Sequence, residues 1–382
     1  MKKSILLLAF VLGWTACTQK GEEVSLQINE KEYFECQGIN ILVFNSEFSG
    51  IFNDEKTAGI QLIHHGVRTA QGGAVRLNRT PEQWDLVPKM TSRTVDAEHG
   101  TINIGLRYEE YDFDSRVTVE SKDNGVEISV WLDEPVPESV AGEAGFNLEF
   151  LPSQYWSKTF VMDGHPGRFP RYAVSDTETR PESEKPLQYK GYKTYDDRGT
   201  GTFIDPLPLA SGHRIVLAPE CPERKIVISS MDDSVPLELF DGRMVAQNGW
   251  FVLRSVIPAG KTGKVISWTV EPNAVKGWIR EPNIGFSQVG YVPDQPKMAV
   301  IELDCKDKPL KKASVFKYSE DGDPERVFTG PVALWGPMLK YNYCQFDFSD
   351  VREPGIYFIR YGGQCTENFT GSGTEQRLFR AV

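Results

Sequence analysis

The sequence of 382 residues lacks a sustained helical pattern, since nowhere do apolar residues recur at i, i+3, i+4 and i+7 through three turns. It also lacks an apolar run of the ~20 residues that a membrane-spanning helix needs. Basic residues are comparatively few, because 42 Lys and Arg stand against 53 Asp and Glu, giving a net charge of -11. This balance argues against nucleic acid as a partner, since no basic stripe is available to neutralise phosphates. It fits an uncharged or cationic partner.

Metal-binding motifs are also missing, as there is no CxxC, no His-x-His and no His-Glu-x-x-His among 5 His and 6 Cys. The cysteines that follow Cys17 are scattered and odd in number, so no disulfide framework is indicated: Cys36, Cys221, Cys305, Cys344 and Cys365. Most of them are expected to be small buried hydrophobes. We predict neither a metal site nor a cofactor. Whether Cys305 and Cys344 pair is left open.

His64 and His65 are the most tempting metal-binding pair. Adjacent residues on a strand point to opposite faces, so the two rings are not expected to share one ion. A packed or hydrogen-bonded role is expected for both.

The N-terminus resembles a bacterial lipoprotein signal. Lys2 and Lys3 precede the short apolar run 5–12, which ends in Trp14-Thr15-Ala16-Cys17. We predict a signal peptide over 1–17, lipidation at Cys17 and a polar tether over 18–30. The expected location is the outer membrane, cell surface or periplasm of a Gram-negative bacterium, with an acyl chain in the bilayer; plain secretion is the alternative.

Strand signals are frequent. The alternating segment 111–119, the dipeptide Asn124-Gly125 and the segment 126–132 predict a β-hairpin with an Asn-Gly turn. Further strands are expected over 146–150, 214–218, 225–229, 250–257 and 264–270, whereas 173–201 is expected to be a solvated insertion. Trp131 and Trp250 lie on strands and are expected in the core. The predicted fold class is all-β, with an N-terminal β-sandwich or supersandwich followed by a small immunoglobulin-like sandwich.

The second sandwich is predicted over 284–366, after an N-terminal domain over 31–272 and a stiff linker over 273–283, and before a tail over 367–382. Gly290, Tyr291 and Pro293 are expected to shape its first turn. Pro354, Gly355 and Tyr357 resemble a tyrosine corner, in which a Tyr hydroxyl ties a strand to the preceding loop.

Two motifs of this region resemble a known family. GFSQVGYVPDQPKMAV at 285–300 and FDFSDVREPGIYFIR at 346–360 closely resemble the N-terminal immunoglobulin-like module of family nine glycoside hydrolases, inverting endo-β-1,4-glucanases of the cellulase type. The resemblance implies β-glucan degradation. In that family, catalysis resides in a following (α/α) helical barrel, where an Asp base and a Glu acid stand ~6.5–9.5 Å apart. No residue here corresponds to them, so we expect a portion without its barrel, name no catalytic residue and leave enzymatic activity open.

The preceding region is similar, more loosely, to the extra N-terminal β-domain of cellulase-type proteins from Bacteroidetes-like bacteria. The segments that carry this similarity are 59–68, 81–85 and 258–263. It implies a supersandwich of the kind used by sugar mutarotases. The resemblance further implies that the two domains support a helical-barrel catalytic domain in an intact homologue.

Candidate glycan-binding residues are aromatic or hydrogen-bonding side chains in polar surroundings: Trp84, Trp156, His65, Arg68 and Arg76. They suit a β-linked polysaccharide or oligosaccharide. The acids at 109, 110, 112, 114, 196 and 197 are expected to be solvated rather than catalytic, because a general acid needs a raised pKa in a cleft. The turn-like segment 163–168 is likewise read as structural. A stand-alone surface glycan-binding lipoprotein and a structural or adhesive sandwich protein are the alternatives.

Overall fold

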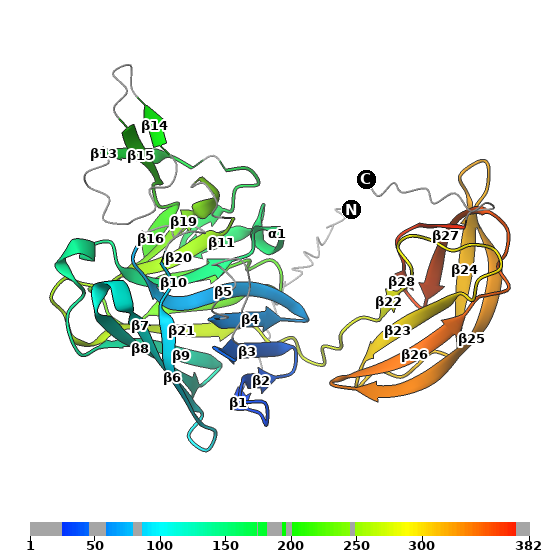
Figure 1. Ribbon diagram of the computed structural model, residues 1–382, viewed down its shortest axis with the longest axis horizontal. Helices are drawn as coiled ribbons and strands as arrows, with labels where there is room; N and C mark the ends of the chain where they lie inside the picture. The colour runs from blue at the N-terminus through cyan, green and yellow to red at the C-terminus, as the bar shows by residue number, and fades with distance from the viewer. Residues whose placement is uncertain are drawn as a thin grey trace, which may run out of the picture. The chain divides into compact units, whose positions relative to one another are not determined.

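The computed structural model describes residues 25–45, 59–78, 86–173, 175–181, 193–195, 201–244 and 249–371. The chain divides into two compact units, residues 1–276 and 277–382, and the division falls inside the predicted linker 273–283. Antiparallel sheets dominate both units, which confirms the all-β fold class (Figure 1). None of the helices in the described ranges is long and apolar enough to span a membrane.

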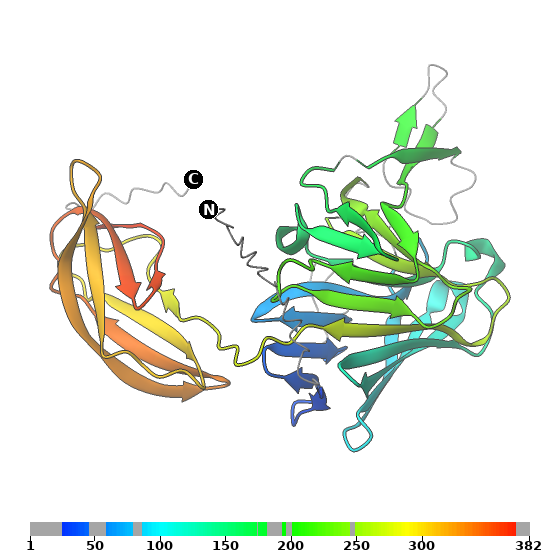
Figure 2. The same cartoon turned by 180° about the vertical axis from the view of Figure 1, so that it is seen from behind.

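Unit 1 contains two nine-stranded sheets, seen from both sides in Figures 1 and 2. The first sheet contains, in spatial order, β1 (Gln27–Ile28), β2 (Phe34–Cys36), β3 (Ile39–Val43), β4 (Ile60–His64), β5 (Val67–Arg76), β10 (Gly145–Phe150), β20 (Phe251–Val256), β19 (Leu237–Asp241) and β16 (Ala210–Gly212). The second contains β12 (His165–Arg168), β11 (Thr159–Met162), β17 (Arg214–Leu217), β18 (Ile226–Ser230), β21 (Gly263–Pro272), β9 (Gly125–Leu132), β8 (Phe113–Lys122), β7 (Thr101–Tyr108) and β6 (Lys89–Asp96). Short helices are η2 (Glu109–Tyr111), η3 (Glu138–Val140), α1 (Pro152–Tyr155) and η5 (Gly242–Met244).

The core of unit 1 lies between these two sheets. On β9 every second residue from Val126 to Leu132 is apolar and buried, and Val117 and Val119 of β8 belong to the same core. Trp268 on β21 joins the two sheets: its ring meets Phe146 of β10 edge-on with centroids 5.0 Å apart, and its indole N–H donates to Ser255 Oγ of β20 at 3.0 Å. The buried indole is therefore both packed and satisfied.

Two expected core tryptophans are not core residues. Trp131 lies on β9 but only half-buried, because its place in the alternation turns it away from the neighbouring core positions. The Arg116 guanidinium and the Lys264 ammonium each lie 5.4 Å from its ring centre. Trp250 precedes β20 and is also only partly buried.

The predicted β8–β9 hairpin is present, although its turn is one residue earlier than expected. Lys122 pairs with Gly125, so the two-residue loop is Asp123-Asn124, with a φ of 39° at Asp123. Gly125 lies within the ladder, where a Cβ would collide with the backbone carbonyl of Val270 on β21. Glycine is needed there for close approach of the next strand, not for the turn.

The segment 173–201, expected to be a solvated insertion, contains strands among its described residues. β13 (Thr177–Pro181), β14 (Lys193–Tyr195) and β15 (Gly201–Pro206) form a separate three-stranded sheet, which projects from unit 1 in Figure 1. Its polar composition hides the strands, because little of the alternation that marks a half-buried strand is present.

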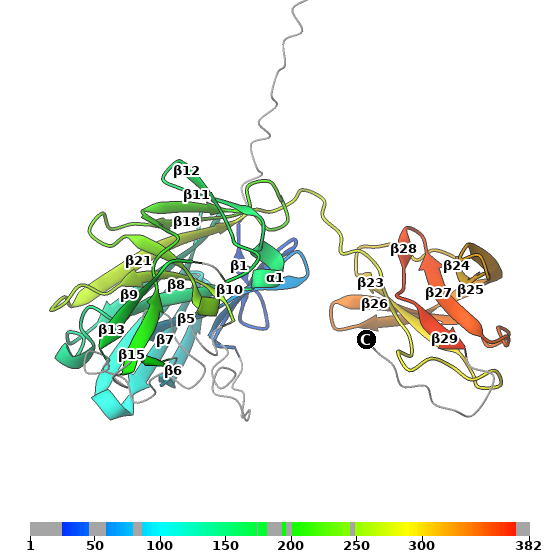
Figure 3. The ribbon, with the colours of Figure 1, turned by 90° about the horizontal axis from the view of Figure 1, so that it is seen from above.

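Unit 2 is an antiparallel sandwich with a core of its own, shown from above in Figure 3. Its strands are, in spatial order, β22 (Asn283–Gly285), β23 (Met298–Asp304), β26 (Tyr341–Asp347), β25 (Pro324–Met338), β24 (Lys312–Tyr318), β27 (Gly355–Tyr361) and β28 (Gln364–Cys365), with β29 (Phe369–Gly371) beside β27. The 15-residue β25 pairs with β24 over 324–331 and with β26 over 332–338, so it passes from one layer to the other. Cys344, Phe346 and Phe348 are buried, as their alternation predicts.

Candidate functional site

His64 and His65 lie side by side rather than on opposite faces. His65 has a φ of 52° and Gly66 a φ of 77°, which makes a two-residue turn between His64 of β4 and Val67 of β5. The rings stack with centroids 4.7 Å apart. The prediction of opposite faces is wrong because β4 ends at His64, so strand alternation does not extend to His65.

Both rings hold the backbone where unit 1 ends. His64 Nε2 donates to the Asn273 carbonyl at 3.0 Å, and His65 Nδ1 donates to the Glu223 carbonyl at 3.1 Å while Nε2 accepts from Val275 N–H. Burial lowers the pKa of His64 to about 3 and also lowers the pKa of His65. His65, a candidate glycan ligand by sequence, is 4% exposed and has both ring nitrogens engaged with backbone. The pair therefore anchors the first residues of the linker.

The remaining glycan candidates do not gather at one place. Arg68 is exposed near the start of β5 and Arg76 lies at its end, a separation of about 26 Å along an extended strand. Trp156 follows α1, is 38% exposed and has the Arg171 guanidinium 5.2 Å from its ring centre. Trp84 lies outside the described residues, as do Cys17 and the acid pair at 196–197.

A buried polar cluster lies beside Arg76 on the face of the first sheet that is turned away from the core. Arg254 of β20 is fully buried and donates to the Asn78 carbonyl and, at 2.8 Å, to Asn147 Oδ1 of β10. Asn147 Nδ2 and Arg76 Nε are buried and have no hydrogen-bond partner among the described residues. Such donors are ordinarily satisfied by internal water. The cluster therefore fits a structural role in the sheet.

The clustered acids of unit 1 form surface ion pairs. Glu109 contacts Lys89 at 2.8 Å, and Arg107 contacts both Asp112 and Asp114. The Lys89 ammonium lowers the pKa of Glu109, the direction opposite to that of a general acid. Within the described ranges, no group of three or more His, Cys, Asp or Glu is arranged to hold a metal ion.

The first turn of unit 2 is built on Gly290 and Tyr291. Gly290 has a φ of 82°, and a Cβ there would meet the backbone carbonyl of Thr370, so only glycine fits. The Tyr291 hydroxyl accepts from Ser287 N–H at 2.9 Å and donates to the Met298 carbonyl at 3.4 Å. Because the Tyr291 N–H also donates to the Thr370 carbonyl at 3.0 Å, the turn is fastened to both β23 and β29.

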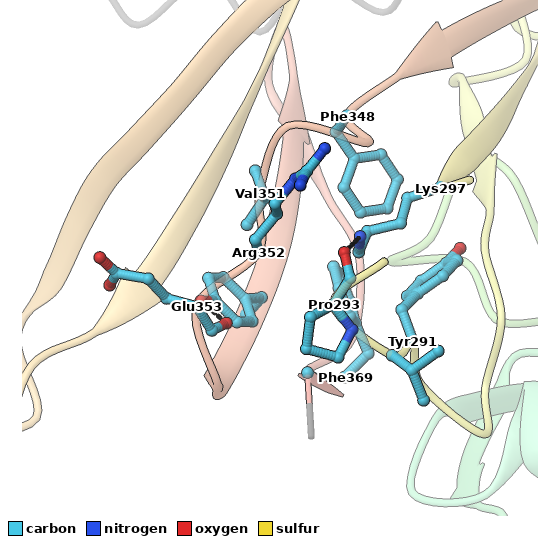
Figure 4. A pocket seen from close by; sticks show the side chains of 11 residues that line it. Tyr291, Pro293, Lys297, Phe348, Val351, Arg352, Glu353 and Phe369 are labelled. Atoms are coloured by element: carbon cyan, nitrogen blue, oxygen red, sulfur yellow. Dashed lines mark hydrogen bonds between the residues drawn. The ribbon is translucent and has the colours of Figure 1, made fainter. Parts of the chain in front are cut away.

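Lys297 lies in a small pocket lined by Tyr291, Pro293 and Phe348 (Figure 4). Its ammonium donates to the Pro293 carbonyl at 2.6 Å, to the Gln295 carbonyl at 3.1 Å and to the Ser349 carbonyl at 3.4 Å. The side chain is 3% exposed, and burial lowers its pKa. Because all three acceptors are backbone carbonyls, the ammonium joins the first turn to the loop after β26 and is not presented to a ligand.

Tyr357 ties β27 to the loop before it. Its hydroxyl donates to the Glu353 carbonyl at 2.5 Å, the contact that characterises a tyrosine corner. Pro354 is exposed in the bend. Gly355 begins β27 in an ordinary conformation, and a Cβ there would press on the Lys317 side chain. Among the matched-motif residues, Gly290, Tyr291, Lys297 and Tyr357 thus make contacts that hold the fold together.

Replacing Tyr357 with Phe is expected to lower the free energy of unfolding of unit 2 by about 1–2 kcal/mol, because the Glu353 carbonyl loses its donor. Tyr318→Phe is the control, since no hydrogen bond from the Tyr318 hydroxyl is found in the described part of the chain. Denaturant unfolding of both variants measures the difference. Equal losses would show that the corner contact contributes nothing specific.

Comparison with known proteins identifies one region. Residues 280–366 match the family model described as the cellulase N-terminal ig-like domain. A solved structure described as a metagenome-derived glycoside hydrolase family 9 endoglucanase is similar at 27% identity, over 24% of this chain and 18% of that chain, with a TM-score of 0.20. The search of curated proteins gave no match. Residues 280–366 of this chain are therefore an immunoglobulin-like domain of the cellulase N-terminal family.

Proposed function

We propose that the chain is a non-catalytic, N-terminal portion of a cellulase-type family nine glycoside hydrolase that acts in β-glucan and plant polysaccharide degradation. The observation that carries the proposal is the match of 280–366 to the cellulase N-terminal domain family. The hydrogen bonds of the motif residues Tyr291, Lys297 and Tyr357 support it, because each of these side chains donates to a backbone carbonyl and so has a structural role. In this role, the sandwich supports a helical-barrel catalytic domain and the chain contributes β-glucan binding.

The test uses a family nine catalytic barrel produced with and without this chain at its N-terminus. The fusion is expected to raise the melting temperature of the barrel and to preserve release of reducing ends from carboxymethylcellulose. A fusion to an unrelated immunoglobulin-like domain of similar size is the control. The chain alone is expected to release no reducing ends. Release of reducing ends by the chain alone would contradict the proposal, and so would a fusion whose barrel melts at the same temperature as the barrel without this chain.

Export and anchoring at the outer membrane through an acylated Cys17 form part of the same proposal, supported by the charged, apolar and Cys-terminated order of residues 2–17. The chain expressed in a Gram-negative host is expected to label with palmitate and to sediment with membranes. Cys17→Ser is expected to abolish both. Labelling of that variant would assign the acyl group elsewhere.

A further inference from the structure

A β-bulge in unit 2 presents an exposed tryptophan. The register of β25 against β26 shifts between Leu334 and Gly336, which leaves Trp335 as the extra residue, and Gly336 has a φ of 137°. Bulges commonly redirect a side chain out of the strand alternation. Trp335 is 59% exposed, although an indole gains much by burial.

Trp335 is the first member of a connected surface cluster. Its ring stands at 88° to that of Tyr343 with centroids 6.3 Å apart. The Tyr343 hydroxyl donates to Glu302 at 2.7 Å, and Arg280 Nη1 donates to the other Glu302 oxygen at 2.5 Å. The Arg280 guanidinium in turn lies 4.7 Å from the ring centre of Tyr341. Five side chains from three strands and the start of unit 2 therefore hold one another in place.

The residues around this cluster are exposed and have small or medium-sized side chains. On the same outer face, Val300 pairs with Gln345 of β26 and with Gly285 of β22, and Gln345 pairs with Ala333 of β25. All four of these residues are exposed. An extended ligand can therefore approach the sheet closely beside the exposed Trp335 ring.

The chemistry of the cluster favours a neutral, hydroxyl-rich ligand. Arg280 and Glu302 are about one-quarter and one-fifth exposed, and they offer donors and acceptors whose charges cancel. An ionic ligand would be attracted by one partner and repelled by the other. An apolar protein surface would bury the ion pair without new partners, which is costly. A pyranose has apolar C–H groups for the indole and hydroxyls for the ion pair.

We propose that Trp335, Tyr343, Glu302 and Arg280 form a binding site for a neutral β-linked glucan chain on the outer face of the immunoglobulin-like domain. The choice of a β-glucan rests on the proposed function. The placement of the site on unit 2 does not, and it differs from the residues of unit 1 that the sequence suggested.

The test is affinity electrophoresis of the full chain in gels that contain hydroxyethylcellulose or xyloglucan. Retardation of the unaltered chain is expected, with affinity reduced about tenfold or more in Trp335→Ala, as for loss of a central aromatic anchor. Trp335→Phe keeps a ring and is expected to retain part of the affinity. Ile356→Ala removes a comparably exposed apolar side chain from β27 and is expected to bind normally. Unchanged thermal unfolding of each variant confirms that it is folded.

An unaltered chain that migrates freely in both gels, or a Trp335→Ala variant that binds normally, would overturn the site. The site would also be overturned if the unaltered chain bound no glucan but self-associated, and if Trp335→Ala abolished that self-association. The face would then be a contact between protein molecules. None of these results affects the barrel-fusion experiment. Failure of the glucan site and failure of the supporting role are therefore distinguishable.

Discussion

Replacing Lys297 with Met is expected to lower the free energy of unfolding of unit 2 by about 2–3 kcal/mol. Methionine preserves the length and apolar contacts of the buried side chain but donates no hydrogen bond. The carbonyls of Pro293, Gln295 and Ser349 would each lose a charged donor at 2.6–3.4 Å. Relief of the buried charge offsets part of this loss, because burial already disfavours the ammonium. The balance favours destabilisation, since one ammonium joins two separate loops.

Lys317→Met is the matched control. Lys317 lies on β24 and pairs at 3.0 Å with Glu353, whose side chain is 80% exposed, so the pair is worth little. Hydrogen exchange measured on peptides from each unit separates the effects: protection in unit 2 is expected to fall for Lys297→Met, while unit 1 is unaffected. Equal protection in the two variants would contradict a joining role for Lys297.

Strands along which apolar and polar residues alternate could be predicted from the sequence. β8 and β9 were predicted with small shifts at their ends, because one face of each is largely apolar. β25 was not predicted, since it contains Gly330, Pro331, Gly336 and Pro337, which ordinarily end strands. It survives as one strand because it changes its pairing partner at Pro331-Val332 and carries a bulge at Trp335. The change of partner and the bulge both depend on where β24 and β26 lie, which the sequence of β25 alone does not indicate.

The candidate sites were less predictable than the strands. Tyr357 could be placed because its contact is four residues away in sequence. The full role of Lys297 could not be predicted, since its third acceptor, the Ser349 carbonyl, is 52 residues away. The cluster around Trp335 could not be predicted either, since it depends on how β25 and β26 pair. The signal for Trp335 was present in its neighbours, as Trp-Gly-Pro inside a strand indicates a bulge. For His65, the following Gly66 indicated a tight turn, and that would have corrected the assumption of strand alternation.

His64 is expected to make the stability of unit 1 strongly dependent on pH. In the folded chain its Nε2 donates to the Asn273 carbonyl, and its buried Nδ1 has no hydrogen-bond partner in the described part of the chain. Burial disfavours the charged ring and, together with the nearby His65 and Arg224, lowers the pKa of His64 to about 3. The unfolded chain takes up the proton near pH 6.5, well before the folded chain does. Stability is therefore present above pH 6.5 and is lost as pH falls toward 3, by about 3 kcal/mol between pH 7 and pH 4.

His64→Gln isolates this contribution, because the amide can still donate to Asn273 but does not titrate. Carboxylates such as Glu127, whose pKa its hydrogen bond with Lys122 lowers to about 2, also destabilise the fold in acid, but they do so equally in both proteins. The measured quantity is thus the difference between the two proteins in unfolding free energy from pH 7 to pH 4, with exposed His165→Gln as the control. A flatter pH dependence of the unfolding free energy is expected in His64→Gln alone.

Because His64 and His65 hold Asn273 and Val275, acid should also expose residues 273–283 to proteases before unit 1 unfolds. Parallel pH curves for all three proteins would show that the histidine pair does not control the anchor of the linker.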